Sequence, residues 1–274
     1  MSDTSLENET GVGADAIDAA ADRLRTAAAT GVTTAPVRDL IGRDDVAAAY
    51  AVQQRLTAER VASGATVVGR KIGLTSEAVQ QQLGVDRPDF GILFDDMAYA
   101  DDATVEFASV LQPKVEAEIA FVLKDDLVEG DLDADQVRAA IDYAVPALEI
   151  CGSRVANWDI SFGDTVADNA SAGAYVLGTE HRTLDEFDPV AAEMHMTVTG
   201  PEGTQDSTGT GAACLGDPVQ AVVWLARQAR ELGDPLRKGQ VILSGALGPM
   251  RPVAPGADVH ATVSGLGSVS VHFS

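Results

Sequence analysis

KVEAEIAFVL, residues 114–123, has the alternating pattern of a β-strand that packs one face against a hydrophobic core. Every second residue is apolar, and we expect these residues to face the core: Val115, Ala117, Ile119 and Phe121. Glu116 and Glu118 then project together from the opposite face, because side chains two residues apart share a face. A second apolar run, PALEIC (146–151), contains the acidic residue Glu149. We therefore expect two strands that carry three carboxylates.

Short runs typical of β-strands, separated by Gly, Pro and Asp turns, continue on both sides of this stretch. They are TVVGRKIGL (66–74), GAYVLG (173–178), EMHMTVTG (193–200), QVILSGAL (240–247), DVHATVSG (258–265) and SVSVHF (268–273). Apolar residues at helical spacing predict four helices, over 14–29, 44–62, 133–144 and 217–232. Strands thus dominate the chain after a helical beginning.

The order of these elements divides the chain into three parts. We expect a disordered acidic N-terminus at 1–13, a helical N-terminal region at 14–65 and a strand-rich domain at 66–274. Apolar residues make up 46% of the chain, which is enough to form a substantial core. No internal repeat or low-complexity linker interrupts it. The sequence therefore predicts an α+β fold.

The net charge excludes several classes of partner. The 274 residues include 42 acidic and 19 basic ones, for a formal net charge of −23. Nucleic acid and anionic membrane surfaces both require clustered Lys and Arg, so neither is an expected partner. The chain has neither a membrane-spanning apolar stretch nor the pattern of a signal peptide, so we expect a cytoplasmic protein. The dispersed acids, with only four lysines, predict a halophilic protein whose surface repulsion is screened by salt.

Glu116, Glu118 and Glu149 form the first candidate site. Two carboxylates on one strand face repel each other unless a cation lies between them or the face lies in water. Three oxygen ligands from two strands suit a hard cation, Mg²⁺ or Mn²⁺, and leave coordination positions open for a substrate. The alternative is a solvated strand face. An acid inside the apolar PALEIC run favours the metal site.

Lys71 and Asp89 form the second candidate site. A lysine within VVGRKIGL is a candidate for proton transfer, since partial burial lowers the pKa of a lysine. Asp89, in DRPDFG, lies between a proline and a turn glycine, although the spacing alone favours a simple Asx-turn. The two cysteines, Cys151 and Cys214, are too few for a disulfide framework, and we expect both to be small buried residues.

Four long blocks of the chain carry specific motifs. They are VGRKIGLTSEAVQQQLGVDRPDFGILFDDM (68–97), LQPKVEAEIAFVL (111–123), PALEICGSRVANWDISFGDTVADNAS (146–171) and LSGALGPM (243–250). In order and without large gaps, these blocks resemble the 2-keto-4-pentenoate hydratases, from the hydratase and decarboxylase branch of the fumarylacetoacetase superfamily. The resemblance implies a mixed β-sandwich roll with flanking helices, with 66–274 as the fumarylacetoacetase-like catalytic domain. It also implies a homo-oligomer.

The resemblance further implies roles for individual residues. Three acids correspond to the family's ligands for a divalent metal: Glu116, Glu118 and Glu149. Two residues correspond to the family's proton-transfer pair, and two serines to its substrate pocket: Lys71 and Asp89, then Ser171 and Ser244. The implied reaction, part of aromatic catabolism, adds water to 2-hydroxypenta-2,4-dienoate (2-oxopent-4-enoate) and gives 4-hydroxy-2-oxopentanoate.

Three alternatives remain open. A 4-oxalocrotonate decarboxylase shares the fold and the metal acids but often lacks the acid of the PDFG block, so Asp89 favours hydration. A 2-oxohept-3-enedioate hydratase would need a cation for the distal carboxylate, and Arg154 is the candidate. A scaffold protein that has kept the fold would have no need of the clustered acids. A downstream aldolase that takes the product is a candidate partner.

Overall fold

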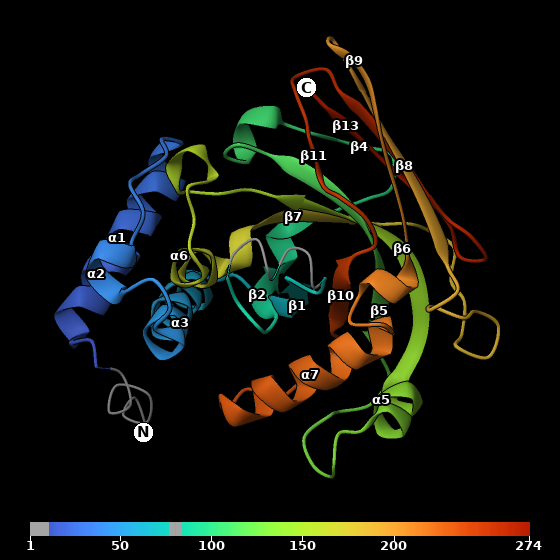
Figure 1. Cartoon of the computed structure of the whole chain (residues 1–274), viewed down its shortest axis with the longest axis horizontal. Helices are drawn as coiled ribbons and strands as arrows, with labels where there is room; N and C mark the ends of the chain where they lie inside the picture. The colour runs from blue at the N-terminus through green and yellow to red at the C-terminus, as the bar shows by residue number, and fades with distance from the viewer. Residues whose placement is uncertain (1–10, 77–79, 81–83) are drawn as a thin grey trace.

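A sheet of eight strands runs through the middle of the molecule (Figure 1). The computed structural model describes residues 11–76, 80 and 84–274. The strands of this sheet are β1 (Val67–Gly73), β2 (Asp89–Phe94), β3 (Ala98–Tyr99), β5 (Lys114–Leu123), β6 (Ile141–Cys151), β7 (Ala172–Leu177), β10 (Val241–Ala246) and β11 (Arg251–Pro252). Their order is β2-β1-β10-β5-β6-β7-β3, and β11 pairs with β5.

A second sheet of five strands lies to one side of the first, with β8, β9 and β13 at the upper right of Figure 1. Its strands are β4 (Ala103–Val105), β8 (Glu193–Gly200), β9 (Gly203–Thr210), β12 (Asp258–Val263) and β13 (Gly267–Phe273). The helices are α1 (Ala14–Thr30), α2 (Arg38–Ile41), α3 (Val46–Ala62), α5 (Ala134–Ala140), α6 (Phe162–Ala167) and α7 (Pro218–Glu231). The structure thus confirms the α+β class.

The antiparallel pair β5–β6 is the centre of the large sheet. The ladder runs from Lys114 opposite Cys151 to Leu123 opposite Ile141. Nearly all residues of both strands are buried, on both faces. The strand pattern of KVEAEIAFVL (114–123) is therefore confirmed as β5, and the strand predicted at 146–151 is correct in type but begins earlier, at Ile141. The alternative of a solvated strand face is wrong, since Glu116 and Glu118 both lie inside the molecule.

Strands β1 and β10 are parallel neighbours, although about 170 residues of sequence separate them, and Lys71 lies opposite Leu243 in their ladder. Gly69 is required for this pairing, because a Cβ at this position would lie 1.9 Å from the backbone oxygen of Val241. Strand β2 then pairs with β1 in the antiparallel sense, with Gly73 opposite Asp89. This arrangement brings the two motif residues, Lys71 and Asp89, to neighbouring strands.

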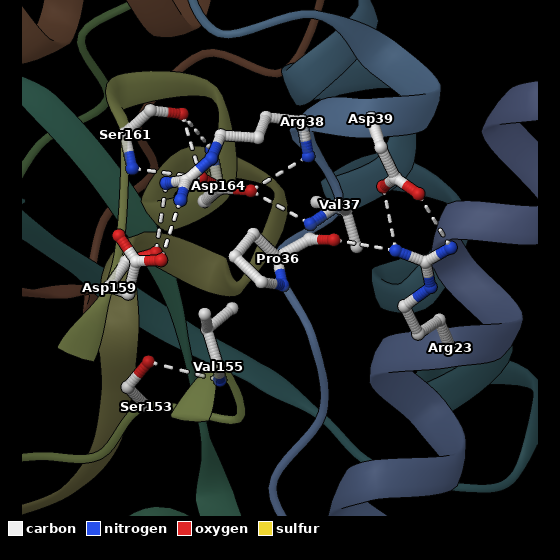
Figure 2. A network of polar contacts seen from close by, with 10 residues as sticks. All are labelled: Arg23, Pro36, Val37, Arg38, Asp39, Ser153, Val155, Asp159, Ser161 and Asp164. Atoms are coloured by element: carbon white, nitrogen blue, oxygen red, sulfur yellow. Dashed lines mark hydrogen bonds and ion pairs between the residues drawn. The ribbon is translucent and has the colours of Figure 1, made fainter. Parts of the chain in front are cut away.

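The predicted N-terminal helices are confirmed as α1 and α3, and they share one hydrophobic core with the sheets. They lie together with α6 on one side of the large sheet (Figure 1). Figure 2 shows the polar network that joins α1, α2 and α6, in which buried Asp164 of α6 accepts hydrogen bonds from the backbone amides of Val37 and Arg38, both at 2.8 Å. Of the N-terminus predicted to be disordered, 1–10 lies outside the described residues.

Two differences from the sequence prediction concern polar or mixed segments. The helix expected over 133–144 ends at Ala140 as α5, and Ile141 already begins β6. Strand β9 has a polar sequence, GTQDSTGT, with no alternating apolar pattern, and it forms because its backbone pairs with β8. Within the described residues, none of the helices has the length and hydropathy needed to span a membrane.

Candidate active site

A cavity of about 730 Å³ opens where β1, β2, β5 and β6 approach the end of β9 and the loop after β10. Four of the seven predicted site residues line it: Lys71, Asp89, Glu116 and Ser171. Glu149 lies directly behind this lining on β6, with its side chain fully buried. The two separately predicted groups of residues, acids and proton-transfer pair, therefore meet at one place.

Glu116 and Glu149 lie directly opposite each other in the β5–β6 ladder. Like charges in this position are destabilising, because cross-strand side chains lie about 5 Å apart. Cys151 shares their face, and its Sγ lies 3.7 Å from Glu116 Oε1. One ligand atom from each of these three residues lies within 4.8 Å of the others. Among the described residues, neither Glu149 Oε1 nor Oε2 accepts a regular hydrogen bond, and the partner of this buried acid is the ammonium of Lys71, in an ion pair with Oε1.

Glu118 differs from the other two acids. It is fully buried and does not line the cavity. Its Oε2 accepts a hydrogen bond of 2.7 Å from the backbone amide of Gly245, while Oε1 has no hydrogen-bond partner among the described residues. Burial, together with the charges of Glu149 and Glu116, raises the pKa of Glu118 well above its usual value. Within the described residues, a hydrogen bond therefore fixes Oε2 of Glu118, and Oε1 is the oxygen that could bind a cation.

Lys71 and Asp89 converge over Gly73. The Lys71 ammonium forms an ion pair of 2.9 Å with Glu149 Oε1. A Cβ at Gly73 would lie 2.2 Å from Asp89 Oδ1 and 3.4 Å from Lys71 Nζ, so only glycine leaves room for both groups. Burial alone would lower the pKa of Lys71, but the charge of Glu149, with weaker contributions from its neighbours, raises the pKa well above the usual value. The expected lowering of this pKa is wrong for this reason.

The acids of the site fit a divalent cation. Burial, and next the charge of Glu149, raises the pKa of Glu116 to about 7. Burial raises the pKa of Asp89 to about 6 against the opposing charge of Lys71. Several carboxylates whose negative charge is this unfavourable in isolation need positive charge nearby. Carboxylate oxygens from rigid strands are ligands that suit Mg²⁺.

The two predicted serines lie in different surroundings. Ser171 lines the cavity, and its Oγ lies 3.2 Å from Thr165 Oγ1. It ends a run of three residues with positive φ, Asn169 to Ser171, a conformation that costs energy in residues other than glycine and recurs at functional sites. Ser244 is fully buried on β10, and its Oγ has no hydrogen-bond partner among the described residues. Ser244 does not line the cavity.

Arg154 does not point to the cavity, in contrast to its proposed role as a cation for a distal carboxylate. Its guanidinium bonds to the buried carboxylate of Asp168 and to the backbone oxygen of Ala172. The residues that line the cavity also include Lys114, Cys151 and Trp158, none of which the sequence had placed in the site. Strand alternation could have indicated two of them, because Lys114 shares a face with Glu116 and Cys151 with Glu149.

Sequence comparisons with known proteins identify relatives that cover more than nine-tenths of the chain. No protein-family model matches the chain. A TodF product hydratase of Pseudomonas putida F1 is 52% identical over 259 residues, which cover 94% of this chain and 96% of that protein. A 2-keto-4-pentenoate hydratase of Paraburkholderia xenovorans LB400 is also 52% identical, over 93% of each chain. The chain belongs to the 2-keto-4-pentenoate hydratase family. Its named members are hydratases, a type of hydro-lyase.

Solved structures place this hydratase-family chain in a wider fold group. A 4-oxalocrotonate decarboxylase from Pseudomonas putida G7, complexed with magnesium and adipate, has a TM-score of 0.91 at 33% identity and covers 97% of this chain and 100% of its own. A fumarylpyruvate hydrolase from Pseudomonas aeruginosa, in complex with Mn²⁺ and pyruvate, has a TM-score of 0.54 at 15% identity, with coverage of 74% and 88%. The second similarity concerns the fold alone.

Proposed function

We propose that the protein is a metal-dependent hydratase that adds water to 2-hydroxypenta-2,4-dienoate and gives 4-hydroxy-2-oxopentanoate in aromatic catabolism. The observation that carries the proposal is that two groups of residues lie together at one cavity: the opposed acids Glu116 and Glu149, of which Glu116 lines it, and the pair Lys71 and Asp89 beside Gly73. Membership of the hydratase family supports the same reaction. A scaffold protein would gain nothing from such buried, unfavourable charges.

In the proposed reaction, side chains of the protein donate and accept the protons. The dienol must lose the proton of its C2 hydroxyl and gain a proton at C5, which gives an unsaturated ketone, and water then adds at C4. Lys71 retains its proton because of Glu149 and is suited to stabilise negative charge or to donate a proton. Asp89, with a pKa raised to about 6, is suited to accept a proton near neutral pH. The two residues titrate as a pair, since the charge of each affects the other.

Glu116, Glu118 and Glu149 are the residues that would hold the divalent metal, with Cys151 beside them. The bound ion would supply Lewis-acid stabilisation of negative charge on the substrate oxygens. Mg²⁺ and Mn²⁺ both suit a set of carboxylate oxygens. We propose both as activating ions. Glu118 lies outside the closest group of potential ligands, Glu116, Glu149 and Cys151, and it would join them through Oε1, the oxygen that does not accept from the Gly245 amide.

The test is to measure dienol loss by absorbance, with and without added Mn²⁺ or chelator, and to identify the product. Glu116→Gln and Glu118→Gln each remove one ligand charge while retaining side-chain shape. We expect at least about a hundredfold loss of turnover in both variants, with weaker Mn²⁺ binding by calorimetry. Glu106→Gln is the matched control, since Glu106 is exposed. Full turnover after complete metal removal would contradict the proposal.

Product identity separates the main alternative. The high structural similarity to a 4-oxalocrotonate decarboxylase makes decarboxylation the second candidate reaction. A 2-hydroxymuconate-type diacid supplied to the enzyme would then release CO₂, whereas a hydratase consumes the monoacid dienol with incorporation of water. Mass spectrometry in ¹⁸O-labelled water distinguishes the two, because only hydration introduces the label at C4. We expect the label in the product.

Several further properties belong to the same proposal. We propose that the protein is cytoplasmic, that its two sheets form the β-sandwich roll of the superfamily, and that it assembles as a homo-oligomer. A downstream aldolase that consumes the 4-hydroxy-2-oxo acid is the proposed functional partner. The charge of −23 supports a halophilic protein. Sedimentation and thermal unfolding in molar and millimolar salt test this last point, with a lower melting temperature expected in low salt.

A further inference from the structure

Lys114 is a cation in the cavity that the proton-transfer chemistry does not use. Of the basic side chains in the described part of the chain, only Lys71 and Lys114 line the cavity. Lys71 is ion-paired with Glu149, whereas no carboxylate of the described residues lies within ion-pair distance of Lys114. Lys114 is thus a cation of the cavity whose charge no described carboxylate neutralises directly. The position is therefore suited to an anion from outside the chain.

The Lys114 side chain is held in place by an aromatic platform. Its ammonium lies 4.1 Å from the centroid of the Trp158 ring, which is a cation–π contact. Trp158 is fixed in turn, because its indole Nε1 donates a hydrogen bond of 3.1 Å to the backbone oxygen of Gln112. The Gln112 side chain accepts from the Asn157 amide at 2.7 Å and donates to the backbone oxygen of Val155 at 2.7 Å. Hydrogen bonds that join Gln112 to Trp158, Asn157 and Val155 therefore fix the position of the Trp158 ring.

This platform is built at a cost in backbone energy. Gln112, Asn157 and Trp158 have φ values of 52°, 60° and 54°, in the left-handed region that favours glycine. Each such residue costs of the order of 1–3 kcal/mol, and such conformations cluster at functional sites. A tryptophan that only filled space would not require them. The strain is explained if the position of the Trp158 ring, and so of the ammonium above it, matters for binding.

We propose that Lys114, supported by Trp158, binds the carboxylate of the substrate. The inference rests on the proposed function, which supplies a small 2-hydroxydienoate as the anion. Lys114 lies opposite Cys151 and two residues before Glu116 on the same face of β5, next to the acid pair. Lys71 and Asp89 come from β1 and β2, with β10 between them and β5. A carboxylate held by Lys114 therefore directs the diene towards the proton-transfer pair.

The test compares Lys114→Gln with Lys114→Arg, and uses Lys124→Gln as a matched control that removes the same charge at an exposed position. The Mg²⁺-loaded enzymes are titrated with pyruvate by calorimetry and assayed with the dienol. An anchor that binds ground state and transition state alike affects KM and not kcat. For Lys114→Gln we expect pyruvate affinity to fall and KM to rise by at least about tenfold, with kcat within about threefold. Lys114→Arg recovers most of the loss.

Two results would overturn the assignment of Lys114. One is parent-like KM and pyruvate affinity in Lys114→Gln, and the other is a loss of kcat with KM unchanged, which would indicate a role in proton transfer. Trp158→Leu provides a second variant that retains the charge but removes its support, with a smaller rise in KM expected. If the parent itself shows no metal-dependent hydration, the proposed function fails, while the pyruvate titration still decides whether Lys114 binds a carboxylate.

Discussion

Asp164 of α6 is a buried carboxylate that joins α6 to the start of α2, and Asp164→Ala should measure how much this contact contributes to the free energy of unfolding. Oδ1 of Asp164 accepts hydrogen bonds from the amides of Val37 and Arg38 (Figure 2). Oδ2 accepts from the Ser161 amide at 2.8 Å, from the Ser161 hydroxyl at 2.7 Å and from the Arg38 guanidinium at 3.0 Å. Alanine at this position removes the acceptor of the Val37, Arg38 and Ser161 donors, and, within the described residues, the Arg38 guanidinium retains only its contacts with Asp159.

The expected loss of stability follows from these contacts. A buried donor left unsatisfied costs about 1–3 kcal/mol, and removal of one member of a buried ion pair costs about 3–5 kcal/mol. Some donors regain water at the partly exposed Arg38, so we expect a total loss of about 4 kcal/mol in the free energy of unfolding. For a chain of this size, this corresponds to a melting temperature lower by roughly 10 °C.

Asp159→Ala is the matched control, because it removes the other carboxylate partner of the same Arg38. The Asp159 side chain is 66% exposed and its ion pair with Arg38 measures 2.7 Å. An exposed pair of this kind contributes about 0–1 kcal/mol. Urea unfolding followed by circular dichroism and by tryptophan fluorescence gives both free energies. If Asp164→Ala lowers the free energy of unfolding no more than Asp159→Ala does, in low salt and in molar salt, Asp164 does not hold α2 against α6 as described.

Two further predictions concern other parts of the molecule. Gly69→Ala places a Cβ 1.9 Å from a backbone oxygen of β10, so we expect a loss of about 3 kcal/mol by urea unfolding, against a negligible change for Gly11→Ala in open space. His272 lies between Asp102 and Asp258, which raise its pKa. Its stabilising effect is therefore complete below pH 6.5 and is lost as the pH rises through the raised value. The stability difference between parent and His272→Gln should shrink from pH 6 to pH 9, and a constant difference would contradict the assignment.

Local sequence patterns predicted the two central strands because each segment has the residue pattern of a strand on its own. KVEAEIAFVL alternates, and PALEIC is apolar apart from Glu149, so both read as strands without tertiary information. The helix expected over 133–144 is partly wrong for the same kind of reason. Apolar residues in DADQVRAAIDYA recur at helical spacing, and only the pairing of β6 with β5 converts the segment from Ile141 onward to a strand.

The candidate site was predictable as a set of residues but not as an arrangement. The motifs identified Lys71, Asp89 and the acids, but no local pattern states that Glu116 lies opposite Glu149 or that β1 pairs with β10. Both depend on which strands pair and in which register, and the paired segments lie far apart in the sequence. The platform under Lys114 was not predictable either, because it depends on the left-handed backbone of Trp158 and its neighbour.

The charges of the site explain why so acidic a cluster can exist inside the protein. Four acids and two lysines gather at or beside the cavity: Asp89, Glu116, Glu118, Glu149, Lys71 and Lys114. Fully ionised, this group has two uncompensated negative charges, and buried charge of this kind is strongly unfavourable. One divalent cation would balance this charge, whereas a monovalent cation would leave one negative charge uncompensated. Because all six residues lie on strands of one sheet, the acids cannot move apart to relieve their repulsion, so binding of a divalent cation would also stabilise the folded sheet.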